Sequence, residues 1–122
     1  MMNRESQNYI LICEKLKELF ENIEVTDQKL RFYQGTYPVV SFIQTNNYVR
    51  KESLGFDDDE TMNIEEYEIE IESDQDMNEI RSIMNAINDV MHHLGYIRTY
   101  CGLDTQDKET KLKRMMLYQT AS

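Results

Sequence analysis

Glu66-Tyr67-Glu68-Ile69-Glu70-Ile71-Glu72 is the stretch of sequence that decides the fold, because charged and apolar residues alternate through it without interruption. Alternation with a period of two is typical of a β-strand that packs one face against a core. Tyr67, Ile69 and Ile71 are therefore expected on the buried face, with the four glutamates on the opposite face. The segment predicts a half-buried strand that carries a stripe of carboxylates.

A long amphipathic helix is expected directly after this strand. Asp76 and Glu79 have the spacing of a capping box, and Ser73 and Asp74 are competing N-caps. Gly95 is well suited to the position after the helix end. The apolar stripe of this helix, which is expected to cover a small sheet, consists of Met77, Ile80, Ile83, Met84, Ile87, Val90, Met91 and Leu94.

The flanking segments complete an α+β pattern. Apolar residues at helical spacing predict a first helix over residues 6–23. Residues 29–33 alternate weakly and are expected to form a weak strand. Tyr37-Pro38 then leads in extended conformation into a strand at Val39–Ile43. Two further strands are expected at 96–101 and 112–119. We expect a mainly antiparallel sheet of about four to five strands, with two amphipathic helices packed on one face.

Composition indicates a single domain covering residues 1–122, without a linker or an internal repeat. The chain has 23 acidic and 13 basic residues, a net charge of -10. Residues 57–79 contain twelve acidic residues and no basic one, so this stretch carries the imbalance. Such a surface disfavours a groove that binds nucleic acid through its phosphates, and it disfavours an anionic membrane surface as well.

Neither a membrane anchor nor a disulfide framework is expected. The longest apolar run, Tyr9–Cys13, is five residues, against about 20 for a spanning helix. The beginning, MMNRESQN, lacks the order of a secretory signal, so the chain is expected to stay in the compartment where it is made. Cys13 and Cys101 have no CxxC spacing and are expected to be ordinary buried or half-buried thiols.

Candidate catalytic and metal-binding residues are few. His92 and His93 are adjacent, so on a helix they point about 100° apart and do not chelate one ion as an i, i+4 pair would. Asp89 and His93 supply at most two ligands. No Ser/His/Asp set, Cys/His set or glycine-rich phosphate loop is present. We therefore predict a protein that is not an enzyme, with no catalytic residue, metal or cofactor.

The segment 46–63 loses periodicity and is predicted to be a long loop or arm. A compact domain rarely keeps a structureless loop of this length unless it is functional or is ordered by a partner. Asp57–Glu60 lacks the register and central glycine of a calcium loop and is expected to be solvated. The candidate assembly residues in the segment are Val49, Leu54, Phe56, Asp57, Asp58, Asp59 and Glu60.

The glutamate stripe has two interpretations. Alternate residues on a strand lie about 6.6 Å apart, so the charges repel one another within a Debye length. Cross-strand pairing with Lys111, Lys113 and Arg114 of the last strand, or simple solvation, would answer that repulsion. Alternatively, the stripe faces something that must not adhere, or it imitates a row of phosphates.

The order of these segments resembles that of the tail terminator and tail-completion (neck) proteins of tailed bacteriophages. The resemblance covers residues 8–119 and lies in an N-terminal amphipathic helix, TYPVVSFI, a long polar loop, EEYEIEIESDQDMNEIRSIMNAINDVMHHLGY, and a closing RMMLYQ. The acidic run Asp57–Glu60 departs from that pattern. The resemblance does not separate a terminator from a neighbouring head–tail adaptor.

This resemblance implies a structural virion protein that assembles as a homo-oligomeric ring, usually a hexamer, on the last ring of the tail tube. Such a ring stops tube growth and contacts the head connector proteins, and DNA passes through it without specific binding. The 46–63 arm would reach a neighbouring subunit or the tube protein, and Glu66, Glu68, Glu70 and Glu72 would form the lumen wall. The implied locations are the host cytoplasm during assembly and then the virion.

A second hypothesis is a binding module of another class. A small acidic inhibitor or DNA mimic would engage a basic partner through the carboxylates of residues 57–79. Association of that kind is steered by charge and falls steeply as salt rises.

Overall fold

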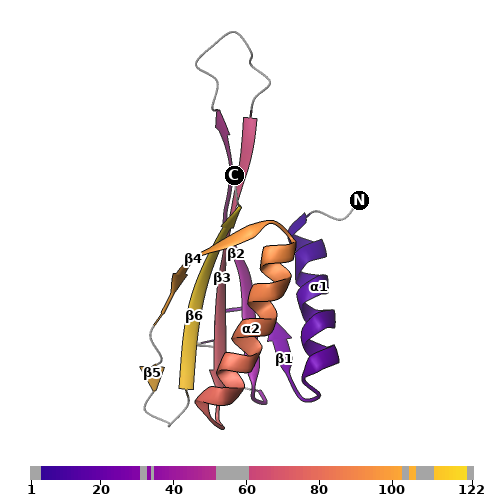
Figure 1. Cartoon of the computed structure of the whole chain (residues 1–122), viewed down its shortest axis with the longest axis vertical. Helices are drawn as coiled ribbons and strands as arrows, with labels where there is room; N and C mark the ends of the chain where they lie inside the picture. Colours follow the sequence, from indigo (N-terminus) through magenta and orange to yellow (C-terminus); the bar gives the residue numbers. More distant parts are fainter. Residues whose placement is uncertain are drawn as a thin grey trace.

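The computed structural model describes residues 4–30, 33, 35–51, 61–102, 105–106 and 112–120. In this part of the chain, two helices form one layer, which packs on a second layer formed by a six-stranded sheet (Figure 1). In chain order they are α1 (Arg4–Leu19), β1 (Glu24–Thr26), β2 (Val39–Lys51), β3 (Thr61–Ser73), α2 (Met77–His93), β4 (Tyr96–Cys101), β5 (Thr105–Gln106) and β6 (Leu112–Thr120).

The strands form a single sheet in the order β1-β2-β3-β6-β4, and the two-residue β5 pairs with β6. Only the β1–β2 pair is parallel, and the other pairs are antiparallel. Side chains of α1 and α2 share one core with one face of the sheet, so both helices cover that face. The predicted α+β fold, a mainly antiparallel sheet with two helices on one face, is confirmed.

The alternating strand is the centre of the sheet. β3 pairs with β2 along one edge and with β6 along the other. The side chains of Tyr67, Ile69 and Ile71 are fully buried against the helices, as the alternation predicts. The opposite face of the sheet, which we call the outer face, carries the glutamates.

Helix α2 begins at the expected signal. Asp76 is the N-cap, and its side chain accepts a hydrogen bond from the Glu79 amide at 2.9 Å. The Ser73 hydroxyl donates to the Glu79 carboxylate at 2.6 Å, so Ser73 supports the cap without being the cap itself. Gly95 follows the helix with a φ of 94°, a left-handed conformation that favours glycine.

Two boundaries near the N-terminus differ from the sequence prediction. Helix α1 ends at Leu19, before residue 23, and the buried Ile23 leads into β1. The weak strand predicted at 29–33 is wrong, because its described residues Lys29, Leu30 and Tyr33 lie outside the sheet. The first strand is β1 instead, and its Val25 packs against the core beside β2.

The predicted loop at 46–63 is also wrong at both of its ends. β2 continues to Lys51 and β3 begins at Thr61, and the two remain paired over Asn46–Lys51 and Thr61–Glu66. Periodicity is lost there because a ribbon held by main-chain hydrogen bonds needs no alternating apolar face. Val49 therefore lies within β2. The remaining predicted assembly residues, Leu54, Phe56, Asp57, Asp58, Asp59 and Glu60, lie outside the described residues.

Neither described helix is long and apolar enough to span a membrane.

Candidate assembly surface

A two-stranded ribbon projects from the domain. β6 pairs with β3 only from Glu66 to Ser73, and β1 pairs with β2 only from Val39 to Ser41. Beyond Glu66 the sheet is therefore reduced to β2 and β3, which extend past the ends of both helices (Figure 1). We call the paired segments 46–51 and 61–65 the ribbon. In the described part of the chain, no third strand pairs with either of its edges.

The ribbon begins at a β-bulge. The register of β2 against β3 shifts between Gln44 and Asn46, which leaves Thr45 as the extra residue. The Thr45 hydroxyl donates to the main-chain oxygen of Glu66 at 3.3 Å, and the Asn46 amide donates to the Glu66 carboxylate at 2.8 Å. A bulge bends its strand and increases the local twist. These contacts therefore set the direction in which the ribbon leaves the sheet.

A buried polar cluster lies under the root of the ribbon, and we call it the root cluster: Asn8, Gln44, Glu65, Tyr67 and Tyr96. The Asn8 amide donates to the hydroxyls of Tyr67, at 3.1 Å, and Tyr96, at 2.9 Å. The Gln44 amide donates to the Tyr67 hydroxyl at 3.2 Å and to Glu65 Oε1 at 3.3 Å. The Tyr67 hydroxyl donates to the same Glu65 oxygen at 3.2 Å.

Tyr67 is the centre of this cluster. Its oxygen accepts hydrogen bonds from two amides and donates one, which uses the full capacity of a phenol. Burial raises the pKa of Tyr67 above its usual range, so the phenol keeps its proton. Thr120 adds a contact from β6, because its hydroxyl accepts from the Glu65 amide at 2.9 Å. The cluster thus ties α1 and four strands to the point where the ribbon begins.

The glutamate stripe lies on the outer face, but its charges are largely paired and covered. Lys29 forms an ion pair with Glu68 at 3.1 Å, and Lys113 forms one with Glu70 at 3.4 Å. The two glutamate side chains keep only 16% and 13% exposure, and Glu72 is buried. A single subunit therefore does not present an open row of carboxylates on this strand, which disfavours a DNA mimic built on it.

The predicted partners of the stripe are corrected by register. Lys113 lies opposite Glu72 on the outer face and pairs diagonally with Glu70, as expected for a cross-strand cation. Arg114 lies on the helix side of β6, where its guanidinium is 3.1 Å from the sulfur of Met84. Its proposed place beside the stripe is therefore wrong. Lys111 lies outside the described residues.

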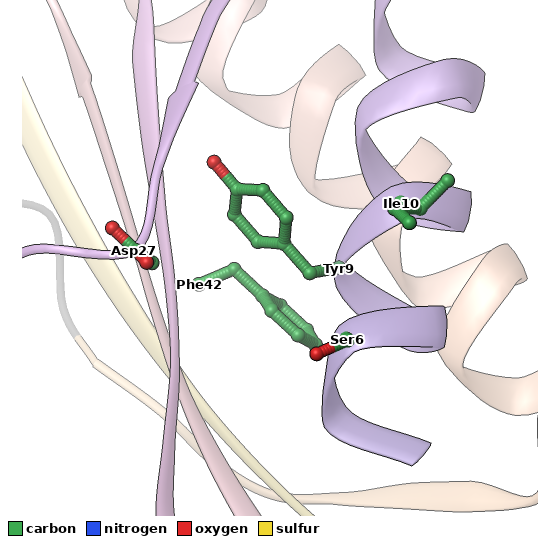
Figure 2. Close-up of a pocket in the computed structure, with 5 residues that line it drawn as sticks. All are labelled: Ser6, Tyr9, Ile10, Asp27 and Phe42. Atoms are coloured by element: carbon green, nitrogen blue, oxygen red, sulfur yellow. The ribbon is translucent and has the colours of Figure 1, made fainter. Parts of the chain in front are cut away.

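A groove of about 200 Å³ lies between α1 and the sheet, lined by Ser6, Tyr9, Ile10, Asp27 and Phe42 (Figure 2). The Tyr9 hydroxyl donates to the main-chain oxygen of Val25 at 3.1 Å, and burial raises the pKa of Tyr9 to about 12. Small-molecule sites usually occupy about 300–1,000 Å³. A wider, open depression of about 510 Å³ lies where α1 meets β1. Neither hollow is lined by a histidine or a cysteine.

The other candidate groups do not converge. His92 and His93 are exposed in the last turn of α2, and both cysteines are free thiols. Burial raises the pKa of the Cys13 thiol, which lowers its thiolate fraction. In the described ranges, no three His, Cys, Asp or Glu side chains lie close enough together to hold a metal ion.

No protein-family model matches the chain, and no curated protein matches its sequence.

The sequence reasoning missed two features of this surface. The root cluster joins Asn8 to partners 59 and 88 residues away, and single polar residues in separate segments give no signal of such a contact. The second feature is the exposure of two apolar side chains of β4, Ile97 and Tyr100. Their spacing of three residues in a strand suggests opposite faces, and only the register of β4 against β6 places them together.

Proposed function

We propose that this chain is a structural protein of a tailed bacteriophage, a ring-forming tail terminator or neck subunit that caps the tail tube and joins it to the head connector. The observation that carries this proposal is the ribbon, which projects beyond the domain (Figure 1). A strand edge presents main-chain donors and acceptors that a neighbouring chain can pair with. A projecting element of this kind would let a subunit contact its neighbours in a ring.

The root of the ribbon supports the same proposal. A closed ring requires a constant angle between successive subunits. The bulge at Thr45 and the buried root cluster hold the ribbon to the domain with side-chain hydrogen bonds of 2.8–3.3 Å. Hydrogen bonds between buried side chains of separate segments restrict how those segments move against one another. The ribbon is thereby held in one direction, as ring closure demands.

Charge is consistent with a ring that transmits DNA without holding it. A net charge of -10 repels the duplex and offers no release of counterions. The ion pairs of Lys29 with Glu68 and of Lys113 with Glu70 neutralise the middle of the glutamate stripe. The proposal therefore assigns the repulsion to the charge of the whole subunit, and Glu66–Glu72 as a lumen wall contributes only part of it.

The test shortens the ribbon while keeping the domain. Val49 and Asn63 face each other across the ribbon, so replacing residues 50–62 by Asn-Gly, a favoured two-residue hairpin turn, shortens it. We expect the wild-type chain to form rings by light scattering and electron microscopy, alone or on tubes of the tail tube protein. The shortened variant is expected to remain a folded monomer.

Two results would contradict the proposal. One is a wild-type chain that stays monomeric at high micromolar concentration even with tail tubes present. The other is a shortened variant that folds and still terminates tube growth at the wild-type length. Circular dichroism and thermal unfolding of the shortened variant establish that loss of assembly does not reflect loss of the fold.

A further inference from the structure

Strand β4 forms an edge of the sheet with exposed apolar side chains. β4 pairs with β6 on one side, and no strand in the described part of the chain pairs with its other side. Four consecutive residues, 97–100, are exposed. Among them, Ile97 is 47% and Tyr100 is 48% exposed. Edge strands usually carry charges or proline that prevent pairing, and β4 has one charged residue, Arg98, and no proline.

The two apolar side chains share the outer face of the sheet. Ile97 lies opposite Gln119 and Tyr100 opposite Leu117, with the register shift between Arg98 and Tyr100 accommodating the extra residue. A bulge re-aims side chains in this way. On the same face of β6, next to them, Leu117 is only half-buried. The β4–β6 half of the outer face is thus an open apolar strip beside an unextended edge.

The other half of the outer face is already covered by the chain itself. The Ser41 hydroxyl donates to the main-chain oxygen of Gln28 at 2.8 Å, and Lys29 reaches Glu68. Leu30 is only 4% exposed over the same region. A partner protein that binds the outer face would therefore contact β4 and β6.

We infer that the β4 edge, with Ile97 and Tyr100, receives the ribbon of a second copy of this chain by strand addition. This inference rests on the proposed ring and assigns its subunit contact. The other edge strand, β1, has only 3 residues. In the described part of the chain, the ribbon and the edge strand β4 lie at different places, so donor and acceptor lie on separate surfaces. A contact of that type is heterologous and repeats head to tail until it closes as a ring.

The lengths of the two strands favour a second copy as the occupant. β4 has six residues, and β2 extends over the six positions 46–51 beyond the bulge. The ribbon strand of one copy can therefore pair along the whole of β4 in the next copy.

The experiment separates donor from acceptor. The acceptor variant carries Ile97→Asp and Tyr100→Asp, and the donor variant has residues 50–62 replaced by Asn-Gly. Each is expected to be monomeric alone by light scattering. A 1:1 mixture is expected to form a dimer and nothing larger, because one intact donor meets one intact acceptor. Leu11→Asp with Leu19→Asp is the matched control, since these α1 residues are 43% and 51% exposed, and it should assemble like the wild type.

The outcomes distinguish this inference from the proposed function. If the wild type forms rings and the acceptor variant does so equally well, or if the mixture forms no dimer, the β4 contact is wrong while the ring stands. If the wild type forms no ring even on tail tubes, both are wrong. Amide hydrogen exchange tests the contact without the acceptor variant, whose two substitutions could impair its folding. The β4 amides should exchange more slowly in wild-type rings than in the monomeric donor variant. Equal exchange rates would overturn the inference.

Discussion

The Tyr67 hydroxyl takes part in three side-chain hydrogen bonds at the root of the ribbon, with Asn8, Gln44 and Glu65. Its ring also stacks on Phe42 at a centroid distance of 4.8 Å and meets Tyr96 edge to face at 5.2 Å. Tyr67 therefore packs its ring in the apolar core, and its hydroxyl helps to position the ribbon. At the residue scale, the two roles can be separated by removing only the oxygen atom.

Tyr67→Phe is expected to lower the free energy of unfolding by about 1–3 kcal/mol, because buried polar partners lose their bond while the ring packing is kept. Urea unfolding followed by circular dichroism measures the change. The matched control is Tyr100→Phe, whose side chain is 48% exposed and whose loss of a hydroxyl should change stability by less than about 0.5 kcal/mol. Equal effects at the two positions would show that the root cluster contributes nothing.

A pH dependence follows from the buried phenols. Burial raises the pKa of Tyr9 and of Tyr118 from 10.0 to about 12. Above pH 10 the unfolded chain releases these protons while the folded chain retains them, so the unfolded state binds fewer protons and stability falls as pH rises. The stabilisation is complete below pH 10 and should be lost progressively toward pH 12. Urea unfolding across this range measures it.

Tyr118→Phe provides the control for the pH prediction. It removes one titrating phenol, and with it the hydrogen bond to Asn88 at 2.9 Å. Stability should therefore be lower below pH 10, and its decline above pH 10 should be shallower than in the wild type. A wild-type stability that stays constant up to pH 12 would contradict the prediction.

At the element scale, the start of helix α2 is decided among several candidate N-caps by one hydrogen bond. Ser73, Asp74 and Asp76 are all acceptable caps in sequence, and the helix begins after Asp76 because the Glu79 amide reaches that carboxylate at 2.9 Å. Asp76→Ala is expected to lower the free energy of unfolding by about 0.5–2 kcal/mol. Asp74→Ala removes the same charge near the same helix end and should cost less than about 0.5 kcal/mol.

Chemical denaturation of the two aspartate variants tests the cap. Because both substitutions remove one negative charge near the positive end of the helix dipole, charge alone predicts similar losses. A larger loss of stability for Asp76→Ala than for Asp74→Ala isolates the contribution of the capping hydrogen bond. Equal losses, or a larger loss at Asp74, would contradict the assignment of the cap.

The strands show how far element prediction from sequence can reach. Ile69 and Ile83 could be predicted as buried because periodicity of two or 3.6 directly reflects which face meets a core. The paired segments 46–51 and 61–63 could not, because apolar and polar residues do not alternate in their sequence and main-chain pairing with a distant segment gives no local signal. Arg114 and Lys113 illustrate the same limit, since pairing register alone decides which of two adjacent cations lies on the outer face.

At the scale of the whole molecule, net charge and the ribbon have separate roles in the proposed ring. In that proposal, the ribbon supplies the contact between subunits, and the acidic surface repels DNA. Because Glu68 and Glu70 are paired with Lys29 and Lys113 within the subunit, neither glutamate is needed to hold a neighbour. The ring and the acidic-inhibitor hypotheses therefore predict opposite behaviour for variants of these glutamates.

Glu68→Gln with Glu70→Gln is expected to leave ring assembly intact and to change stability by no more than about 1 kcal/mol for each pair. Light scattering and urea unfolding measure the two quantities. The control is Glu14→Gln with Glu18→Gln, which removes the same charge from the exposed side of α1. Loss of assembly in the first variant alone would show that the carboxylates bind a basic partner, as the acidic-inhibitor hypothesis requires.

The sequence by itself determined the α+β class, the central strand at 66–72 and the helix that follows it, because burial imposes a local period on neighbouring residues. The tertiary structure decided the reach of the ribbon, the root cluster and the pairing of the glutamate stripe. Asn8 lies 88 residues from Tyr96, and Lys29 lies 39 residues from Glu68. Contacts between single residues so far apart leave no periodic trace, so only the folded chain brings them together.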